Sequence, residues 1–344
     1  MNLICWNCRG LGAPRAVHEM TKMVRKVNPL VLFLSETKKK STEMEWLRYQ
    51  WRYDNCLAVD SVGRGGGLAL LWMSEVHLEV KFFSAQHIDV NIGGSNETTR
   101  WRFTGFYGSP EVSLRHRSWD LLRQLKNQSS LPWLCAGDFN EILVDDEKIG
   151  GLLRPTRQME GFRQVIHECD FLEVPFSGPK FTWSRGRGSR MILERLDRGF
   201  ATDSFFKLFP MTGEEHIPAV FSDHALLLFT ITNFQEQVRR QKRAFRFENM
   251  WLRHSGCRET IIDSWRSNKV TDFKSLAKEV KHCGERLTKW NTDVFGNIKH
   301  KINKKEEELR KLLFAIKSTK GADNIDQCRR EIAELYIRKE VLWK

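Results

Sequence analysis

Short apolar runs alternate with amphipathic stretches along about the first 230 residues of the chain. The run LVLFLSE at 30–36 is apolar almost throughout, as expected of a strand covered on both faces. The runs at 76–83 and 87–92 alternate polar with apolar residues, which predicts antiparallel neighbours with one wetter face. The other runs that predict strands are 2–6, 67–72, 101–107, 133–139, 181–183, 195–200 and 225–231.

Amphipathic stretches separate these strands. Apolar residues from Val17 to Val27 recur at spacings of three and four, which predicts a helix that ends before Pro29. Two further helical stretches cover 114–127 and 157–170. Strands mixed with helices on outer faces predict an α/β or α+β sandwich built in layers.

The pattern changes after about residue 233, where a basic run is followed by long helical stretches. Leu309, Leu312 and Ile316 keep helical spacing there. We therefore expect an α/β domain over 1–232 and a basic helical extension over 233–344. Residues from 231 onward carry 27 Lys and Arg against 16 Asp and Glu, so they hold net +11 of the chain's +13. A polyanionic partner is a reasonable inference for this part, although solvated basic helices are common.

Composition supports a packed core. Hydrophobic residues make up 41% of the 344 residues and aromatic residues 11%, which argues against general disorder. No apolar stretch approaches the roughly 18 residues that a membrane span requires, and the N-terminus lacks the organisation of a signal peptide. We expect an intracellular protein that does not bind membranes. Its eight cysteines are too sparse for a disulfide framework and are interpreted as buried thiols.

Several predicted strands end in polar groups for which an apolar run has no structural need. They are Asn7, Glu36, Tyr107, Asp138, Asn140, Asp197, Ser222, Asp223 and His224. Each has an ordinary alternative: Asn and Asp form turns and helix caps, a Tyr ring can belong to the core, and a single His is more often structural than catalytic. Asp138 and Asn140, two positions apart, would project from one face of an extended chain.

Taken together, these groups suit one chemistry. Carboxylates such as Glu36 and Asp223 are the hard oxygen ligands that Mg²⁺ prefers. A carboxylate free of the metal, such as Asp138, could orient or deprotonate a water molecule. A His paired with a carboxylate, His224 with Asp197, could hold its charge against a phosphate oxygen. The set indicates metal-assisted phosphoester hydrolysis.

Short motifs in a fixed order strengthen this hypothesis. They are CWNCRG (5–10), LSETK (34–38), GFYGSP (105–110), GDFN (137–140), FTW (181–183), RLDRGF (195–200) and SDHALLLF (222–229). In this order they resemble the endonuclease/exonuclease/phosphatase, or DNase I-like, superfamily, and the match covers roughly 1–232. The resemblance implies a four-layer sandwich of two mixed β-sheets flanked by helices.

The resemblance also implies roles for individual residues. Glu36 is similar to the main Mg²⁺ ligand, with Asn7 beside it and Asp223 completing the metal side. Asp138 resembles the residue that activates the nucleophile, and Asn140 its phosphate-binding neighbour. The remaining positions resemble a His that contacts phosphate, its orienting carboxylate, a Tyr at the scissile phosphate and substrate-facing residues: His224, Asp197, Tyr107, Thr182, Trp183 and Ser222.

One position departs from the apurinic endonucleases, which typically carry an acidic residue where this chain has Arg9. An arginine there would repel a second cation but could contact substrate phosphate. The segments WNCRGLG, GRGGGLALLW and EKIGG resemble plant non-LTR retrotransposon endonucleases. The tail segments RFENMWLRH and WNTDVFGNIKHKI resemble the connection from that endonuclease to a reverse transcriptase, which we expect to be truncated here or encoded elsewhere.

The sequence thus predicts a DNA endonuclease of retroelement type that depends on Mg²⁺, with Mn²⁺ as a possible substitute, and a nuclear location. One alternative is an apurinic-site endonuclease or a phosphatase for small substrates. Another is a decayed retroelement remnant that binds nucleic acid or protein without cutting. The tail helices are interpreted first as a packed bundle or partner surface, and direct contact of the basic run 239–246 with DNA or RNA is the alternative. The oligomeric state is open.

Overall fold

The structure is a computed structural model, and the ranges that it describes are 1–61, 65–94, 100–232, 247, 251, 255–265, 272–316 and 321–341. The chain divides into two compact units. The first comprises Met1–Glu236 with Arg310–Asp326, and the second comprises Gln237–Leu309 with Gln327–Lys344. The predicted domain boundary at residue 232 remains a prediction.

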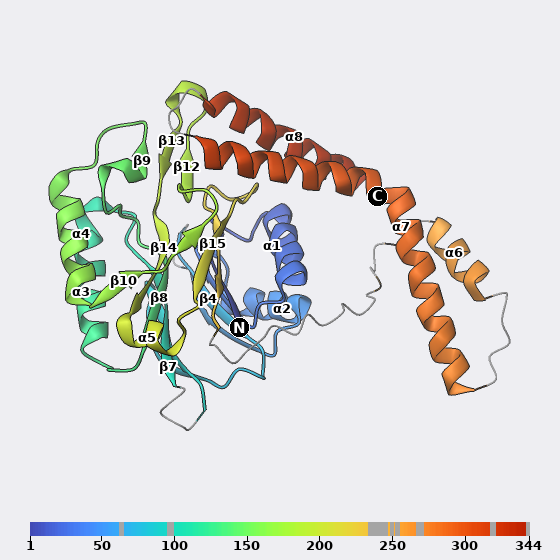
Figure 1. Ribbon diagram of the computed structural model, residues 1–344, viewed down its shortest axis with the longest axis horizontal. Helices are drawn as coiled ribbons and strands as arrows, with labels where there is room; N and C mark the ends of the chain where they lie inside the picture. The colour runs from blue at the N-terminus through green and yellow to red at the C-terminus, as the bar shows by residue number, and fades with distance from the viewer. Residues whose placement is uncertain are drawn as a thin grey trace. The chain divides into compact units, whose positions relative to one another are not determined.

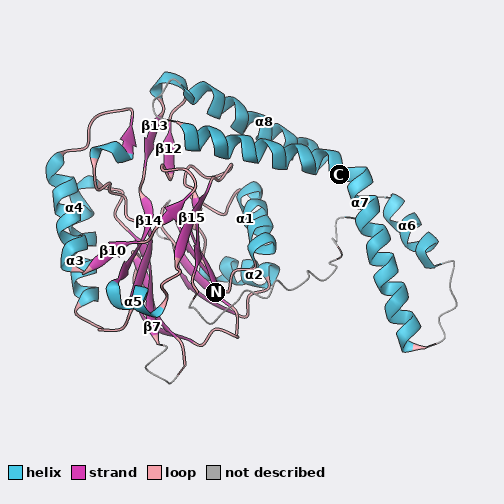
Figure 2. Cartoon of the chain, in the orientation of Figure 1, coloured by secondary structure: helices cyan, strands magenta, loops and turns pink. Residues whose placement is uncertain are grey.

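Two large mixed sheets form the first unit (Figures 1 and 2). The first sheet has the strand order β11-β15-β16-β1-β2-β4-β3. In this sheet β1 pairs parallel to β2 and antiparallel to β16. Its strands are β1 (Asn2–Asn7), β2 (Val31–Ser35), β3 (Asn55–Val59), β4 (Leu68–Trp72), β11 (Phe176–Ser177), β15 (Gly213–Ile217) and β16 (Leu226–Thr230).

The second sheet has the order β10-β14-β8-β7-β6-β5. Here β7 pairs parallel to β8, and β14 pairs antiparallel to β8. The runs at 76–83 and 87–92 pair antiparallel as β5 and β6, as predicted, but the predicted wetter face is wrong for β6, whose residues are all buried, whereas β5 is largely exposed. Its strands are β5 (Leu78–Phe83), β6 (His87–Ile92), β7 (Trp101–Tyr107), β8 (Trp133–Asp138), β10 (Phe171–Glu173) and β14 (Asp197–Thr202).

Alternation along each central strand divides the apolar side chains between two cores. Leu3, Cys5 and Phe33 point between the sheets, where they pack against residues such as Phe103 and Leu134 of the second sheet. The intervening residues of the first sheet, among them Ile4, Trp6 and Leu32, pack against helices on the outer face. Both faces of β1 and β2 are therefore covered, which explains their nearly continuous apolar runs.

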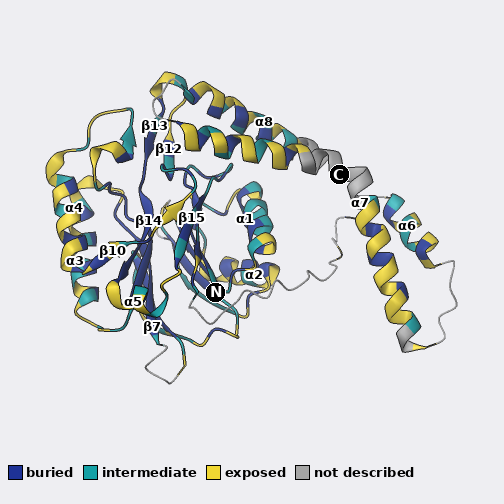
Figure 3. Ribbon diagram, viewed as in Figure 1, coloured by how far each residue is buried: buried dark blue, intermediate teal, exposed yellow. Residues whose placement is uncertain are grey.

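Helices close both outer faces of the sandwich, and Figure 3 shows buried strands between partly exposed helices. On the first sheet these are α1 (Pro14–Val27) and α2 (Ser41–Trp51). On the second sheet they are α3 (Arg115–Lys126) and α4 (Thr156–Glu168), packed around Phe139. A shorter helix, α5 (Asp203–Leu208), follows β14. The predicted layered sandwich of two mixed sheets flanked by helices is confirmed.

A small third sheet with the order β12-β13-β9 lies outside the predicted pattern. Its strands are β12 (Trp183–Arg185), β13 (Ile192–Glu194) and β9 (Lys148–Ile149). The strand predicted at 181–183 therefore begins only at Trp183, the last residue of the predicted range. Short 3₁₀ turns occupy Val112–Leu114, Asp145–Glu147 and Gly188–Arg190.

The C-terminal part is helical where the structure describes it, as predicted. Its helices are α6 (Ser255–Trp265), α7 (Phe273–Ala315) and α8 (Ala322–Val341). The basic run 239–246 lies outside the described residues. Seven of the eight cysteines are buried and all are free thiols, as expected. In the described chain, no helix is both long and apolar enough to cross a membrane.

Candidate active site

The sheet topology brings distant strand ends to one edge of the sandwich. In the first sheet, β1 and β2 run parallel, so that β1 ends at Asn7 and β2 ends at the residue before Glu36. Because β16 runs antiparallel to β1, His224, two residues before β16, lies at the same edge. In the second sheet, β7 and β8 end in Tyr107 and Asp138, which are register partners, and Asp197 at the start of β14 is paired directly with Asp138. Ligands of such sheets bind beyond the strand ends.

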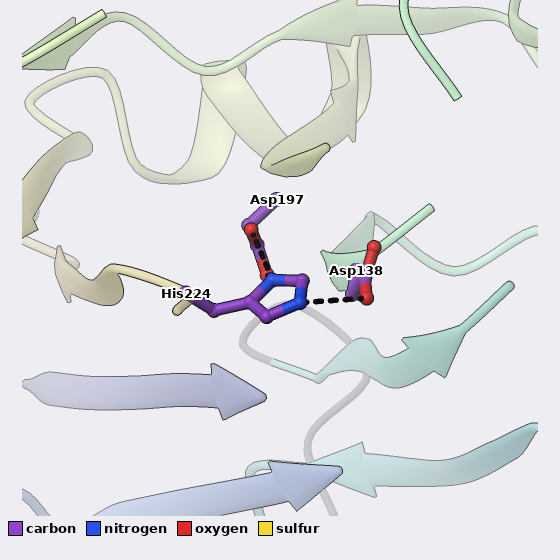
Figure 4. Close-up of side chains that lie close together, drawn as sticks. All are labelled: Asp138, Asp197 and His224. Atoms are coloured by element: carbon purple, nitrogen blue, oxygen red, sulfur yellow. Dashed lines mark hydrogen bonds and ion pairs between the residues drawn. The ribbon is translucent and has the colours of Figure 1, made fainter. Parts of the chain in front are cut away.

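A buried carboxylate–histidine–carboxylate arrangement occupies the centre of this edge (Figure 4). His224 Nδ1 lies 3.1 and 2.9 Å from the two carboxylate oxygens of Asp197. On the other side of the ring, His224 Nε2 lies 3.9 Å from Asp138 Oδ2, which is too far for a hydrogen bond. All three side chains are almost completely buried. Asp197 therefore orients the ring, and Nε2 points toward Asp138 without a hydrogen bond to it.

The buried charges perturb each other. Burial, reinforced by the charge of Asp197, raises the pKa of Asp138 to about 7. Burial acts to lower the pKa of His224, but the charges of Asp197 and Asp138 outweigh it and raise that pKa to about 9. Near neutral pH the site thus holds an imidazolium next to a carboxylate that is poised to exchange a proton. Such perturbed pairs are typical of catalytic acid and base groups.

Two carboxamides hold Asp138 in place. Asn7 Nδ2 donates to Asp138 Oδ2 at 2.9 Å, and Asn140 donates through its backbone N–H to Oδ1 at 2.8 Å. Asn140 Nδ2 also donates to Asp138 Oδ2 at 3.1 Å and to the carbonyl of Gly108 at 2.9 Å. Asn140 adopts the left-handed backbone region, with φ of 54°. The GDFN turn thus aims its amide back at the strand end.

Glu36 forms a second polar centre next to Asp138. Its Oε1 accepts hydrogen bonds from Asn7 Nδ2 at 3.2 Å and from the Tyr107 hydroxyl at 2.9 Å. Burial, with the charge of Glu36, raises the pKa of Tyr107 well above its usual range, so the hydroxyl remains a donor. Asn7 therefore joins Glu36 to Asp138. Glu36 Oε1 thus faces two neutral donors, while Oε2 lies 3.8 Å from Lys38 Nζ, and the Glu36 side chain is 18% exposed.

Two groups of residues could therefore hold a metal ion. Glu36 offers the hard carboxylate oxygens that suit Mg²⁺, whereas the Asn7 carboxamide beside it turns its Nδ2 toward Glu36 and its Oδ1 toward the N–H of Arg9. Asp138, Asp197 and His224 also present three ligand atoms within 4.8 Å of one another. A metal at the second group would bind the neutral form of His224, so its binding there would release the proton of the ring.

Asp223, predicted on the metal side, is held by other partners. Its Oδ2 accepts from Trp183 Nε1 at 2.9 Å and forms an ion pair with Arg9 Nη1. The described contacts of this carboxylate do not include Glu36. The structure thus brings Arg9, Trp183 and Asp223 together at the rim, and the role of Asp223 as a metal ligand stays a prediction.

Thr182 and Ser222, predicted to face the substrate, bond to the backbone instead of pointing outward. Thr182 Oγ1 accepts from the N–H groups of Leu196 and Asp197 at 3.0 and 2.9 Å. Ser222 Oγ donates to the carbonyl of Asn7 at 2.9 Å and accepts from the N–H of His224 at 3.1 Å. Both hydroxyls hold the strand ends that carry Asn7, Asp197 and His224, and substrate contact by them remains a prediction.

Two neighbours of the site were given no role from the sequence. Lys38 Nζ lies 3.8 Å from Glu36 Oε2, and the motif LSETK already contained this lysine. Trp6 Nε1 donates to the carbonyl of His224 at 3.2 Å and so fixes the backbone of the histidine. A tryptophan in an apolar strand carries no signal for this contact.

Residues 4–224 match the Endonuclease/Exonuclease/phosphatase family, and the chain belongs to this family. The predicted membership is confirmed. No curated protein sequence matches the chain.

Solved structures share the fold at low identity. The endonuclease domain of TRAS1, a telomere-specific non-LTR retrotransposon, superposes with a TM-score of 0.51 and 12% identity, covering 68% of this chain and 99% of that one. The AP endonuclease LMAP from Leishmania major superposes with a TM-score of 0.52 and 15% identity, covering 67% of this chain and 87% of that one. The 3′ phosphatase NExo (D146N) from Neisseria, bound to a product DNA hairpin, superposes with a TM-score of 0.51 and 15% identity, covering 67% of this chain and 99% of that one.

Proposed function

We propose that this protein is a Mg²⁺-dependent DNA endonuclease that hydrolyses one phosphodiester bond in a strand. The observation that carries the proposal is the convergence of Asp138, Asp197 and His224, beside Glu36 and Tyr107, from separate strand ends. Most of these groups are deeply buried polar side chains, and a fold needs no such set for its stability.

The geometry suggests how the residues would share the reaction. Asp138 would accept the proton of the attacking water, since a base with a pKa near 7 is suited to neutral pH. His224 would donate a hydrogen bond from Nε2 to a non-bridging phosphate oxygen, with Asp197 holding the ring. Asn140 and the Tyr107 hydroxyl would bind the same phosphate. When bound at Glu36, Mg²⁺ would offset the negative charge of the phosphate.

Two observations favour DNA as the substrate. The fold is shared by a retrotransposon endonuclease domain and by a phosphatase bound to a DNA product. The basic region from 231 onward, with net +11, suits a polyanion, and contact with RNA through this region is also compatible with its charge. If the protein derives from a non-LTR retroelement, as TRAS1 does, the useful product of cleavage would be a 3′-hydroxyl that can prime reverse transcription. The expected location would then be the nucleus.

Three other functions make different predictions. An apurinic endonuclease would cut an abasic oligonucleotide much faster than an intact duplex, and Arg9 on the metal side argues against it. A small-substrate phosphatase would release phosphate from an aryl phosphate. A decayed remnant would bind DNA without cutting, and the complete polar set argues against decay.

A nicking assay on supercoiled plasmid, with Mg²⁺ or with EDTA, tests the proposal. We expect relaxed circles with Mg²⁺ only. Because loss of one such group typically costs about 10²–10³ in rate, Asp138→Ala and His224→Ala should nearly abolish nicking. Asp203→Ala and His167→Ala are matched controls at exposed positions and should cut normally. Full activity in folded, purified Asp138→Ala or His224→Ala protein would refute the assignment.

A further inference from the structure

Two adjacent leucines project from the loop between β9 and α4. Leu152 and Leu153 are 91% and 84% exposed, more than any other large apolar side chain in the part of the chain that the structure describes. Single exposed leucines are common on protein surfaces, whereas two neighbours at the tip of one loop form an apolar projection. Removing such a projection from water is favourable, so the pair is suited to a binding partner.

The loop is held at both ends, which gives the projection a defined position. At its start, Gly151 adopts φ of 67° and packs so closely on β13 that a Cβ there would lie 2.9 Å from Ile192 Cδ1. At its end, Arg154 Nε lies 3.0 Å from Glu141 Oε1, and Arg154 Nη2 lies 2.9 Å from Glu194 Oε2. The two leucines therefore lie on a short turn between fixed points.

The small third sheet connects this loop to His224 (Figure 1). Lys148 of β9 pairs with Glu194 of β13, which in turn pairs with Trp183 of β12. Trp183 then forms a β-bridge with His224. Neighbouring strands are about 4.8 Å apart, so β9 lies about 14 Å from His224. Because successive bases of a duplex are about 3.4 Å apart, this distance is about four base steps from a phosphate at His224.

Three exposed arginines provide positive charge on the same sheet. They lie on β12 and in the turn to β13, and with Gly186 they line a depression of about 650 Å³: Arg185, Arg187 and Arg190. Arg185 is the register partner of Ile192, the residue that Gly151 adjoins. No described carboxylate pairs with these arginines, and Asp326 accepts instead from the backbone N–H of Gly188 at 3.0 Å. A row of phosphates fits this charge, whereas an apolar protein surface would leave it unmatched.

We propose that Leu152 and Leu153 insert between neighbouring base pairs of a DNA duplex while the three arginines bind the flanking phosphates. Insertion unstacks one base step, about four steps from the phosphate at His224, and kinks the duplex there. Pyrimidine–purine steps such as TA open most easily, so the leucine pair selects deformable steps near the position of cleavage. The inference rests on the proposed DNA cleavage and adds to it a source of sequence preference.

Unstacking can be measured on the full chain without cleavage. A short duplex with 2-aminopurine at its TA steps is titrated in EDTA, and binding is followed in parallel by fluorescence anisotropy. The 2-aminopurine fluorescence should rise about twofold or more when wild type binds, because an unstacked base is no longer quenched by its neighbours. The double variant Leu152→Ala/Leu153→Ala should lose this rise. Its dependence of affinity on salt should stay unchanged, because no charge is removed.

Leu172→Ala/Met211→Ala is the matched control. It truncates two apolar side chains that are 51% and 62% exposed on other elements, and it should behave as wild type does. With Mg²⁺, plasmid nicking by the Leu152/Leu153 variant should fall about 10-fold or more, since a scissile phosphate that is not seated reacts slowly. Thermal melting should show that both double variants fold, as expected for exposed positions.

The outcomes separate this inference from the proposed function. An absent rise on a duplex that wild type binds would overturn the inference. So would a rise that survives in the Leu152/Leu153 variant, which would assign the pair to a protein or membrane partner, or a rise that the control also loses. A fluorescence rise in a wild type that never nicks plasmid would contradict only the proposed cleavage. Nicking without a rise would contradict only the insertion, and a wild type that binds no DNA would overturn both.

Discussion

Replacing Asp197 with Asn tests whether this carboxylate sets the charge of His224. Both Asp197 oxygens face His224 Nδ1, and the amide of Asn can keep one of these hydrogen bonds while losing the charge. Burial opposes the charged ring, yet the pKa of His224 is raised from 6.5 to about 9. At about 1.36 kcal/mol per pKa unit, this rise is worth about 3 kcal/mol in favour of the imidazolium.

The expected effect depends on pH in a defined direction. Since the histidine pKa is raised, its charge is present below about 9 and is lost above it. At pH 8 about 90% of His224 is protonated in the wild type, against about 3% in Asp197→Asn if the pKa returns to about 6.5. The fraction of protein with a charged His224, and with it the nicking rate, should therefore fall roughly 30-fold. At pH 6 both proteins are mostly protonated, so this part of the loss nearly disappears. Asp138 must be ionised, which confines wild-type activity to about pH 7–9.

The measurement is the rate of plasmid nicking from pH 5.5 to 9.5 at saturating Mg²⁺. The alkaline limb of the Asp197→Asn profile should move toward neutral pH. Asp203→Asn changes an exposed carboxylate and should leave both limbs in place. Thermal melting verifies that both variants fold. A loss for Asp197→Asn that is the same at every pH would refute the reasoning, because it would show that Asp197 does not control the protonation of His224.

Further outcomes follow from individual contacts. Tyr107→Phe removes the hydroxyl that donates to Glu36 Oε1. Loss of this hydrogen bond, worth about 1 kcal/mol, should raise the Mg²⁺ concentration for half-maximal nicking several-fold. An unchanged concentration would contradict a role for Tyr107 in holding Glu36. Glu36→Gly removes the carboxylate from a position with φ of 50°, so nicking should stop while the melting temperature does not fall. Gly137→Ala should lower the free energy of unfolding in urea by more than about 3 kcal/mol, because its Cβ would lie 2.1 Å from the carbonyl of Phe106. If the basic run 239–246 contacts phosphates, changing its Lys and Arg to Gln should flatten the dependence of DNA affinity on salt.

The long apolar runs were enough to predict most of the sandwich. Strands such as β2 and β8 are buried on both faces, so their runs stand out from the amphipathic helices. Helix α2 was missed because Trp46 and Tyr49 are exposed on it, which obscures its amphipathic spacing. The strands of the third sheet are two or three residues long and too short to show a period.

Which residues lie at the site was easier to predict than which of them bond to one another. Polar residues at strand ends meet because parallel ends share an edge, and this needs only the strand order. The pairing of Arg9 with Asp223 joins positions 214 residues apart and depends on the direction of both side chains. For the same reason no pattern could show that Thr182 and Ser222 bond to the backbone.

Three residues of the site have an unusual backbone conformation. Arg9, Glu36 and Asn140 adopt φ of 47°, 50° and 54°, a region that favours glycine and costs other residues about 1–3 kcal/mol each. Asn tolerates this region, but Arg and Glu gain nothing local from it. Asn28 and Arg52 adopt the same region at the C-caps of α1 and α2, far from the site, so positive φ by itself does not mark a functional residue. At the site its effect is geometric: the two turns place the Arg9 and Glu36 side chains next to Asn7.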